Sequence, residues 1–284
     1  MRPIKRRIFL AFASVLMASF LGACAVNPYE GNSKTRSDAL LKQQFEAAEQ
    51  RRAASPDGRI IFAGFALNSQ SKAFRNDVLT AEKGVLSIDP NALVFKLNNP
   101  VLGQDADWPF ATTENVEQVL LKVAAMARPQ DKVVVLLTTH GNVDMLSVNF
   151  NDKEYPHINS RALNQWLANL RGKPTLLLVS ACFSGSFLQT LSGPSRVVLT
   201  AAARDRSSFG CQFQSTNTYF VDALLNQSSL KDRSIEQLME QAKIAIDKRE
   251  RDGKLSPPSL PQMFVGTAAK TWANVPLKTW LEGQ

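Results

Sequence analysis

The sequence is poor in the residues from which metal sites are built, with two histidines and three cysteines among its 284 residues. The cysteines form no Cys-x-x-Cys pair and the histidines form no His-Glu-x-x-His motif, so an adequate set of zinc ligands is missing. A glycine-rich loop of the kind that cradles phosphates is also missing. We therefore predict that the protein works without a metal ion and without another cofactor.

Clustered positive charge is also scarce, although the formal net charge of the chain is +8. Four cationic residues lie in an N-terminal segment that we expect to be removed, and without them the charge falls to +4. The basic stretch from Lys248 to Lys254 alternates in sign, as the solvated end of a helix does, and contains no aromatic residues. Nucleic acid is therefore not an expected partner.

The N-terminal segment has the layout of a secretory signal. Basic residues precede an apolar stretch from Ile8 to Phe20, which is too short to span a membrane as a mature helix. The stretch ends in Leu21-Gly22-Ala23-Cys24, which resembles the lipobox of bacterial lipoproteins, where cleavage before the cysteine leaves that residue lipid-modified. The alternative is an ordinary signal peptide followed by an incidental cysteine. The basic residues are Arg2, Lys5, Arg6 and Arg7.

The residue after this cysteine indicates which membrane would hold the anchor. In Gram-negative bacteria an aspartate at that position favours retention in the inner membrane, and here the residue is Ala25. The resemblance therefore implies a lipid anchor at Cys24 on the periplasmic face of the outer membrane. We predict a signal peptide over residues 1–23, a tether and an N-terminal helix over 24–58, and one domain over 59–284.

Segments typical of strands and helices alternate through this domain. Strands separated by helices of ten or more residues imply a mostly parallel sheet with right-handed crossovers, so the predicted fold class is α/β. The predicted strands are 59–67, 92–97, 133–139, 175–180, 196–203 and 261–266, with a hairpin at 145–150. The predicted helices are 38–53, 70–85, 113–127, 159–170, 216–225 and 234–248.

Two of the apolar runs end in a reactive residue. One leads into His140-Gly141, and the other leads into Cys182. Runs rich in Val and Leu suit strands that are buried on both faces of a parallel sheet, and the carboxyl ends of such strands hold ligands. If the two strands are neighbours, an imidazole lies beside a thiol, which is a nucleophile with its base. The pattern therefore predicts a cysteine hydrolase.

These motifs resemble those of the legumain family of cysteine peptidases, within the wider caspase-like group. Ala-Cys-Phe-Ser-Gly-Ser at 181–186 is similar to the family's Ala-Cys-Glu-Ser-Gly-Ser, and Thr200–Cys211 is similar to its Thr-Thr-Ala-Asn-Pro-Arg-Glu-Ser-Ser-Tyr-Ala-Cys. The similarity covers roughly residues 60–266. It implies a caspase-like three-layer sandwich, a catalytic dyad of His140 and Cys182, and a peptide or protein substrate.

Catalysis by a cysteine requires the thiolate form, and two neighbours are expected to favour it at Cys182. One is His140, and the other is the N-terminal end of a helix predicted over 183–190, whose free N–H groups favour negative charge. The N–H groups of Gly141 and Cys182 are expected to bind the oxyanion of the tetrahedral intermediate. Glycine at position 141 suits this role because it lets the backbone approach the substrate.

The sequence departs from the family pattern at two acidic positions. Ser180 stands where the family usually has a glutamate before Ala-Cys, so an assisting acid is missing. Gln214 stands where asparaginyl members have the acidic residue that binds the substrate amide. We therefore expect no strict preference for asparagine at the cleaved position. Asn68 only loosely matches an asparagine that follows the first strand in the family.

Four residues are predicted to bind the substrate. Ser207, Ser208 and Gln214 are expected near the specificity pocket, and its basic residue is expected to be Arg75, with Lys72 as the alternative. Should a strict asparagine preference be found, Asp205 is the alternative acid.

Several residues also have a purely structural interpretation. A disulfide between Cys182 and Cys211 is the alternative to a free nucleophile, because an oxidising compartment favours pairing. His157 is expected in a surface turn. Ser180 and Ser184 lack the Gly-x-Ser-x-Gly elbow of serine hydrolases and are expected to be structural.

Two functions therefore remain open from the sequence. The first is a membrane-tethered cysteine endopeptidase, or a transpeptidase that uses the same acyl-enzyme. The second is a non-catalytic lipoprotein that keeps the fold as a binding or scaffold module. Intact His140, Gly141 and Cys182 favour the first function, while the replaced acids at Ser180 and Gln214 favour the second.

Overall fold

Six strands form the central sheet, in the order β2-β1-β3-β7-β8-β9. The computed structural model describes residues 32–55, 57–101, 106–150 and 153–281. The strands run parallel except for the last, β9, which is antiparallel to β8. Because β2 and β3 lie on opposite sides of β1, the direction of winding reverses there, which is where open α/β sheets bind ligands. The strands are β1 Ile60–Ala66, β2 Leu93–Asn98, β3 Lys132–Thr138, β7 Thr175–Ser180, β8 Arg196–Thr200 and β9 Gln262–Val265.

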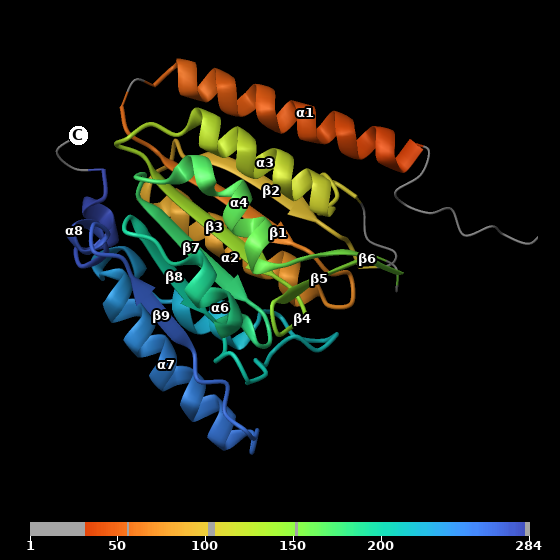
Figure 1. Cartoon of the computed structure of the whole chain (residues 1–284), viewed down its shortest axis with the longest axis vertical. Helices are drawn as coiled ribbons and strands as arrows, with labels where there is room; N and C mark the ends of the chain where they lie inside the picture. The colour runs from red at the N-terminus through yellow and green to blue at the C-terminus, as the bar shows by residue number, and fades with distance from the viewer. Residues whose placement is uncertain (1–31, 56, 102–105, 151–152, 282–284) are drawn as a thin grey trace, which may run out of the picture.

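Helices cover both faces of the sheet and produce three layers (Figure 1). One face carries α2 Lys72–Ile88, α6 Tyr219–Leu225, α7 Ile235–Asp252 and α8 Lys270–Ala273. The other face carries α1 Asn32–Ala53, α3 Thr113–Met126, α4 Ser160–Trp166 and α5 Leu188–Leu191. Short 3₁₀ helices lie at Ala168–Leu170, Ser184–Phe187, Leu230–Asp232 and Leu277–Thr279. The predicted α/β fold with a mostly parallel sheet is confirmed.

The central strands are buried along their whole length, as their apolar sequences predict. Every residue of β1, β3 and β7 is buried, because helices pack on both faces of these strands. The apolar face of α2 also packs against the sheet, with Phe74 and Val78 fully buried. Burial of these side chains supplies the main driving force for the fold.

Polar caps fix helix ends that the hydrophobic periodicity left uncertain. α3 begins at Thr113, as predicted, and is capped by Thr112. α6 begins only after Thr218, whose side chain accepts from the Val221 N–H. Asn159 caps α4, which ends at Trp166, so the predicted stretch to residue 170 includes a separate 3₁₀ turn. The capping box of Ser234 at α7 agrees with the predicted start.

A small antiparallel sheet extends from the carboxyl end of β3. It consists of β4 Gly141–Asn142, β5 Met145–Phe150 and β6 Lys153–Ile158, and it lies at the right-hand side of Figure 1. The alternation that predicted a hairpin at 145–150 is confirmed. His157 is exposed as expected, but it lies in β6 and not in a turn.

The first helix covers the edge strand β2. α1 begins at Asn32, earlier than predicted, and Ser37 is buried where its hydroxyl accepts from the Phe110 N–H at 2.9 Å. The Gln44 side chain accepts from the Lys96 N–H at 2.8 Å and donates to the Lys96 carbonyl at 3.0 Å, so it satisfies backbone groups at the outer edge of the sheet. Within the described ranges, none of the helices is long and apolar enough to cross a membrane. Residues 1–23 and Cys24 lie outside those ranges.

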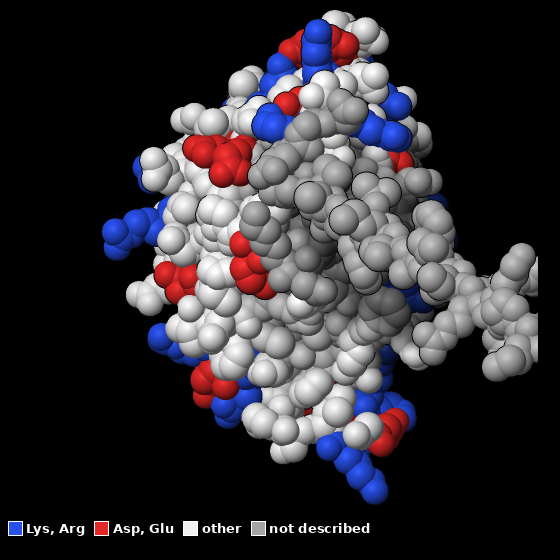
Figure 2. Space-filling view, turned by 90° about the vertical axis from the view of Figure 1, so that its right-hand side faces the viewer, with Lys and Arg blue, Asp and Glu red and all other residues white. Residues whose placement is uncertain are grey.

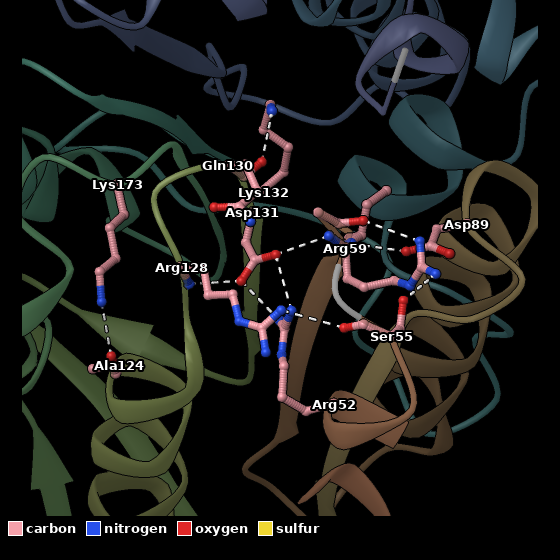
Figure 3. Close-up of polar contacts among 12 residues, drawn as sticks. Arg52, Ser55, Arg59, Asp89, Ala124, Arg128, Gln130, Asp131, Lys132 and Lys173 are labelled. Carbon is pink, nitrogen blue, oxygen red and sulfur yellow. Dashed lines mark hydrogen bonds and ion pairs between the residues drawn. The ribbon is translucent and has the colours of Figure 1, made fainter. Parts of the chain in front are cut away.

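A buried ion pair fastens the end of α1 to the amino edge of the sheet (Figure 3). Asp131 is fully buried, and its carboxylate accepts from Arg52 at 2.7 Å. The same carboxylate accepts from the backbone N–H groups of Arg59 at 2.8 Å and Arg128 at 2.7 Å. One side chain therefore links α1 to the entries of β1 and β3.

Asp131→Ala should lower the free energy of unfolding by about 3–5 kcal/mol, because it leaves the buried Arg52 guanidinium without its charge partner. Urea denaturation followed by circular dichroism measures this change. The matched control is Asp252→Ala, which removes an exposed pair with Lys248 and should cost less than about 1 kcal/mol. Equal losses in the two variants would contradict the assignment of Asp131 as a fastening point.

Candidate active site

The register of β3 and β7 brings the two reactive residues to one edge of the sheet. Thr138 pairs with Ser180, and the Thr139 N–H donates to the Ser180 carbonyl at 3.1 Å. His140 and Cys182 each follow two residues after this pair, so they leave adjacent parallel strands side by side. The structure therefore places the two strands next to each other, as the apolar runs predicted.

Gly141 packs directly against the backbone of Cys182. A Cβ atom at position 141 would lie 2.7 Å from the Cys182 carbonyl oxygen and 3.0 Å from the Ala181 Cβ, so only glycine fits there without displacement. In the part of the chain that the structure describes, the Cys182 N–H has no hydrogen-bond acceptor. The predicted oxyanion-binding groups are therefore neighbours, and the Cys182 N–H is available.

The sulfur of Cys182 lies against Ser208, in the loop between β8 and α6. The Ser208 N–H donates to Cys182 Sγ at 3.3 Å, and Sγ lies 3.6 Å from the Ser208 carbonyl oxygen and 3.7 Å from its hydroxyl. These contacts hold the sulfur of Cys182 against the Ser208 loop. Cys182 and Cys211 are both free thiols in the structure, so the alternative disulfide is not formed. Burial is the main reason that the pKa of Cys211 is raised to about 11.

The helix predicted to start directly after Cys182 differs from the structure. Phe183 has a left-handed backbone with φ of 56°, and the residues after it form a four-residue 3₁₀ helix. The Phe183 N–H donates to the Arg206 carbonyl at 2.7 Å, and the Gly185 N–H donates to the Ala202 carbonyl at 2.9 Å. These N–H groups are occupied, so the free helix end predicted to face Cys182 is not formed, and the backbone N–H that contacts the sulfur comes from Ser208. The left-handed Phe183 costs about 1–3 kcal/mol, a strain typical of functional sites.

His140 is half-buried between α2 and the small sheet. The ring of Phe74 meets it edge-on, with centroids 5.1 Å apart. Burial lowers the pKa of His140 below its ordinary value because the imidazolium loses hydration, while the negative charge of Glu154 acts in the opposite direction. A neutral imidazole at neutral pH can accept a proton, which is what a general base requires.

Comparison with known proteins agrees with this site. The model of the Peptidase C13 family matches residues 112–267, a range that includes both reactive residues and more than half of the chain. The chain belongs to the peptidase C13 family. Caspase-1 from Spodoptera frugiperda has the same fold, with a TM-score of 0.50 at 16% identity over 74% of this chain and 86% of that chain. None of the curated proteins matches.

This C13 peptidase is thus a cysteine peptidase with a caspase-like fold. The resemblance to the legumain family that the motifs indicated is confirmed. Among the described residues, no group of three or more His, Cys, Asp or Glu could hold a metal ion. Uncharged residues predominate in the uncovered middle of the face viewed in Figure 2, and Lys and Arg lie mainly at its margins.

Three of the four residues predicted to bind substrate lie in the loop beside Cys182, and the fourth lies on α2. Ser207 and Ser208 are half-buried in the loop that touches Cys182, and Gln214 is exposed on a turn of the same loop. Arg75 instead forms a two-pronged ion pair with Asp107 at 2.7 and 2.8 Å and stacks on Trp108. Its role in substrate binding stays a prediction.

Three further positions named from the sequence have polar partners in the C13 peptidase. Asn68 donates from its side chain to the Ser147 hydroxyl at 3.2 Å, next to the small sheet. Ser180 shares a hydrogen bond of 3.0 Å with the Thr218 hydroxyl, and Ser184 accepts from the Ala202 N–H at 3.1 Å. Both serines are buried, which agrees with their structural interpretation.

Sequence reasoning missed Asp77 and Glu154. Glu154 accepts from the Ser147 hydroxyl at 3.0 Å and from the Asn149 side chain at 3.1 Å, and its charge acts on His140. Asp77 lies fully buried on the apolar face of α2. A charged residue at the helical spacing of the apolar residues Phe74, Val78 and Ala81 is the signal that could have revealed it, because buried carboxylates are rare without a specific partner.

Gly141→Ala should reduce peptide hydrolysis by about 10²-fold, because the added methyl group displaces the Cys182 backbone from its position. The control is Gly193→Ala, since a Cβ there meets only the flexible Arg196 side chain at 3.4 Å. Steady-state rates at matched folded concentrations provide the measurement. Wild-type activity in Gly141→Ala would show that close packing at this position is dispensable.

The imidazole of His140 should titrate with a pKa below 6.5, and Glu154→Gln should lower that pKa further by removing the charge that favours the imidazolium. Two-dimensional NMR of the histidine side chains as a function of pH measures both values. A pKa of His140 above 6.5, or an increase in the Glu154→Gln variant, would refute the assigned balance between burial and charge.

Proposed function

We propose that the protein is an endopeptidase in which Cys182 is the nucleophile and His140 is the general base. The observation that carries this proposal is the convergence of His140, Gly141 and Cys182 at the carboxyl ends of two adjacent buried strands. The neutral imidazole of His140 adds support, because it can accept the proton of the thiol, and the Ser208 loop holds the sulfur in place.

The reaction follows from these groups in four steps. His140 takes the thiol proton of Cys182, and the thiolate attacks the carbonyl carbon of the scissile peptide bond. The N–H groups of Gly141 and Cys182 bind the resulting oxyanion, an interaction worth about 3–4 kcal/mol for one donor. The imidazolium then protonates the departing amine, which leaves a thioester. Attack by water on the thioester, with His140 again accepting the proton, releases the acid and restores the enzyme.

The same thioester permits transfer as well as hydrolysis. If the amino group of a second peptide attacks in place of water, a new peptide bond forms and the protein acts as a transpeptidase. Product analysis by mass spectrometry with and without an added acceptor peptide separates the two outcomes.

The rival function is a binding or scaffold module without catalysis. It is favoured by Ser180 and Gln214, which replace acids of the family, and by the fact that Ser180 is engaged in a hydrogen bond with Thr218. Labelling with a library of cysteine-directed acyloxymethyl ketones separates the two hypotheses. Covalent modification of Cys182 that depends on the peptide part of the reagent supports the peptidase, and no modification at any peptide sequence supports the scaffold.

Cys182→Ala should abolish peptide hydrolysis while preserving the melting temperature, because no other group can form the acyl-enzyme. The matched control is Cys211→Ala, which removes the second half-buried thiol and should keep most of the activity. Rates on a fluorogenic peptide library and circular dichroism check the two expectations. Turnover by Cys182→Ala above a small fraction of wild type would exclude this residue as the nucleophile.

We further propose that a lipid at Cys24 anchors the peptidase domain to the periplasmic face of the bacterial outer membrane. The support is the sequence Leu21-Gly22-Ala23-Cys24, preceded by basic and apolar residues and followed by Ala25. A tether and α1 would then separate the anchor from the peptidase domain. Peptide or protein substrates reaching that membrane surface are the expected targets.

Cys24→Ser should prevent lipidation and transfer the protein from the membrane fraction to the soluble fraction. Fractionation of cells after metabolic labelling with an alkyne fatty acid measures both effects. Cys211→Ser serves as the control, because this thiol belongs to the folded domain and not to the lipobox. Continued labelling and membrane association of Cys24→Ser would reject the lipobox interpretation.

A further inference from the structure

Asp77 is a buried carboxyl group directly behind the candidate active site. It is 0% exposed, and it lies on α2. One of its oxygens accepts from the hydroxyls of Thr138 and Thr218, both at 2.8 Å. The other oxygen accepts from the Thr218 N–H and from the Asn217 side chain, both at 3.0 Å. Four donors from two other segments therefore converge on one side chain.

These hydrogen bonds reach both strands that carry the reactive residues. Thr138 is the last residue of β3, and it lies two positions before His140. Thr218 passes the connection to Ser180 at the end of β7 through a hydrogen bond of 3.0 Å, two positions before Cys182. Because Thr138 and Ser180 are also register partners, one carboxyl group holds the two strand ends from behind.

The same helix also holds the loop that supports the sulfur. Ser71 donates to the Gln212 carbonyl at 2.8 Å, and Asn76 donates to the Thr216 carbonyl at 2.7 Å. These contacts and those of Asp77 fasten the segment 212–218 to α2. The Ser208 N–H, which donates to Cys182 Sγ, lies just before this segment.

A carboxyl group at this depth is costly to ionise without a charged partner. No lysine or arginine among the described residues pairs with Asp77, and burial raises its pKa to about 7 despite the four hydrogen bonds. Among the titratable groups of the described residues, Cys211 interacts with Asp77, whose charge raises the pKa of that thiol in small part. Strongly perturbed groups of this kind cluster at functional sites.

We propose that Asp77 is the positioning residue of the active site, which sets the placement of His140, Cys182 and the Ser208 loop through Thr138 and the Thr218–Ser180 pair. It touches neither substrate nor the reacting atoms, so it acts through other residues. The proposal rests on the proposed roles of His140 and Cys182 in catalysis.

The test compares variants that keep the shape of the network and change its hydrogen bonds. Asp77→Asn keeps one acceptor oxygen for the Thr218 N–H. At the hydroxyls of Thr138 and Thr218 it replaces an acceptor oxygen with an NH₂ group, which can only donate. Thr138→Val removes one hydroxyl at constant volume, and Thr138→Ser restores it. The control is Asp89→Asn, because Asp89 is also buried and caps the opposite end of the same helix.

Two readouts on the detergent-solubilised full chain separate positioning from stability. The first is kcat and KM on a cleaved peptide. The second is the rate of iodoacetamide alkylation of Cys182 as a function of pH, followed by mass spectrometry of its peptide, which needs no substrate. Melting temperatures report the stability of every variant.

Asp77→Asn and Thr138→Val should lower kcat by about 10- to 100-fold with little change in KM, since small displacements of reacting groups have effects of this size. The pH profile of Cys182 alkylation should shift in both variants. Thr138→Ser should restore both readouts, and Asp89→Asn should lower the melting temperature without changing either.

An unchanged kcat and an unchanged alkylation profile in Asp77→Asn would overturn the proposal. Equal changes in Asp89→Asn would also overturn it, because they would show a general effect of lost stability. Failure of the proposed function looks different, since wild type itself would then hydrolyse no peptide. In that case the alkylation profiles alone decide whether Asp77 positions the thiol. If Asp77→Asn does not fold, the comparison of Thr138→Val with Thr138→Ser decides the question in the same way.

Discussion

The parallel pairing of β3 with β7 is the constraint on which the site depends. Both strands are buried on both faces, so their register is held by apolar packing as well as by hydrogen bonds. A slip of one residue would turn every side chain of a strand to the opposite face of the sheet, where it would no longer fit the helices packed there. The positions of His140 and Cys182 are therefore fixed by the core and not by the loops that follow.

The two edges of the sheet use buried aspartates in different ways. At the amino edge, Asp131 is paired with Arg52 and fastens α1, so the charge is neutralised where it is buried. At the carboxyl edge, Asp77 has only neutral donors around it. The first arrangement follows the usual pattern for a buried charge, and the second carries an energetic cost that stability alone does not explain.

The environment of Cys182 shows how a departure from the family pattern is accommodated. Where the family usually has a glutamate before Ala-Cys, Ser180 joins the hydrogen-bond network behind the strands. Where a helix N-terminus was expected to favour the thiolate, the left-handed Phe183 turns the chain and the Ser208 N–H meets the sulfur instead. Local backbone strain and a loop distant in sequence thus replace a regular element.

The sequence by itself determined the alternation of strands and helices, the burial of β3 and β7, and the position of His140-Gly141 and Cys182 just beyond the ends of these two strands. These features follow from local hydrophobic periodicity and from motifs that occupy consecutive residues. Only the tertiary structure decided that Ser208 supports the sulfur, that Arg75 is engaged by Asp107, and that Asp77 joins β3 to the start of α6. Such contacts join residues up to 141 positions apart, and no local pattern records which distant partner a polar side chain meets once the chain has packed.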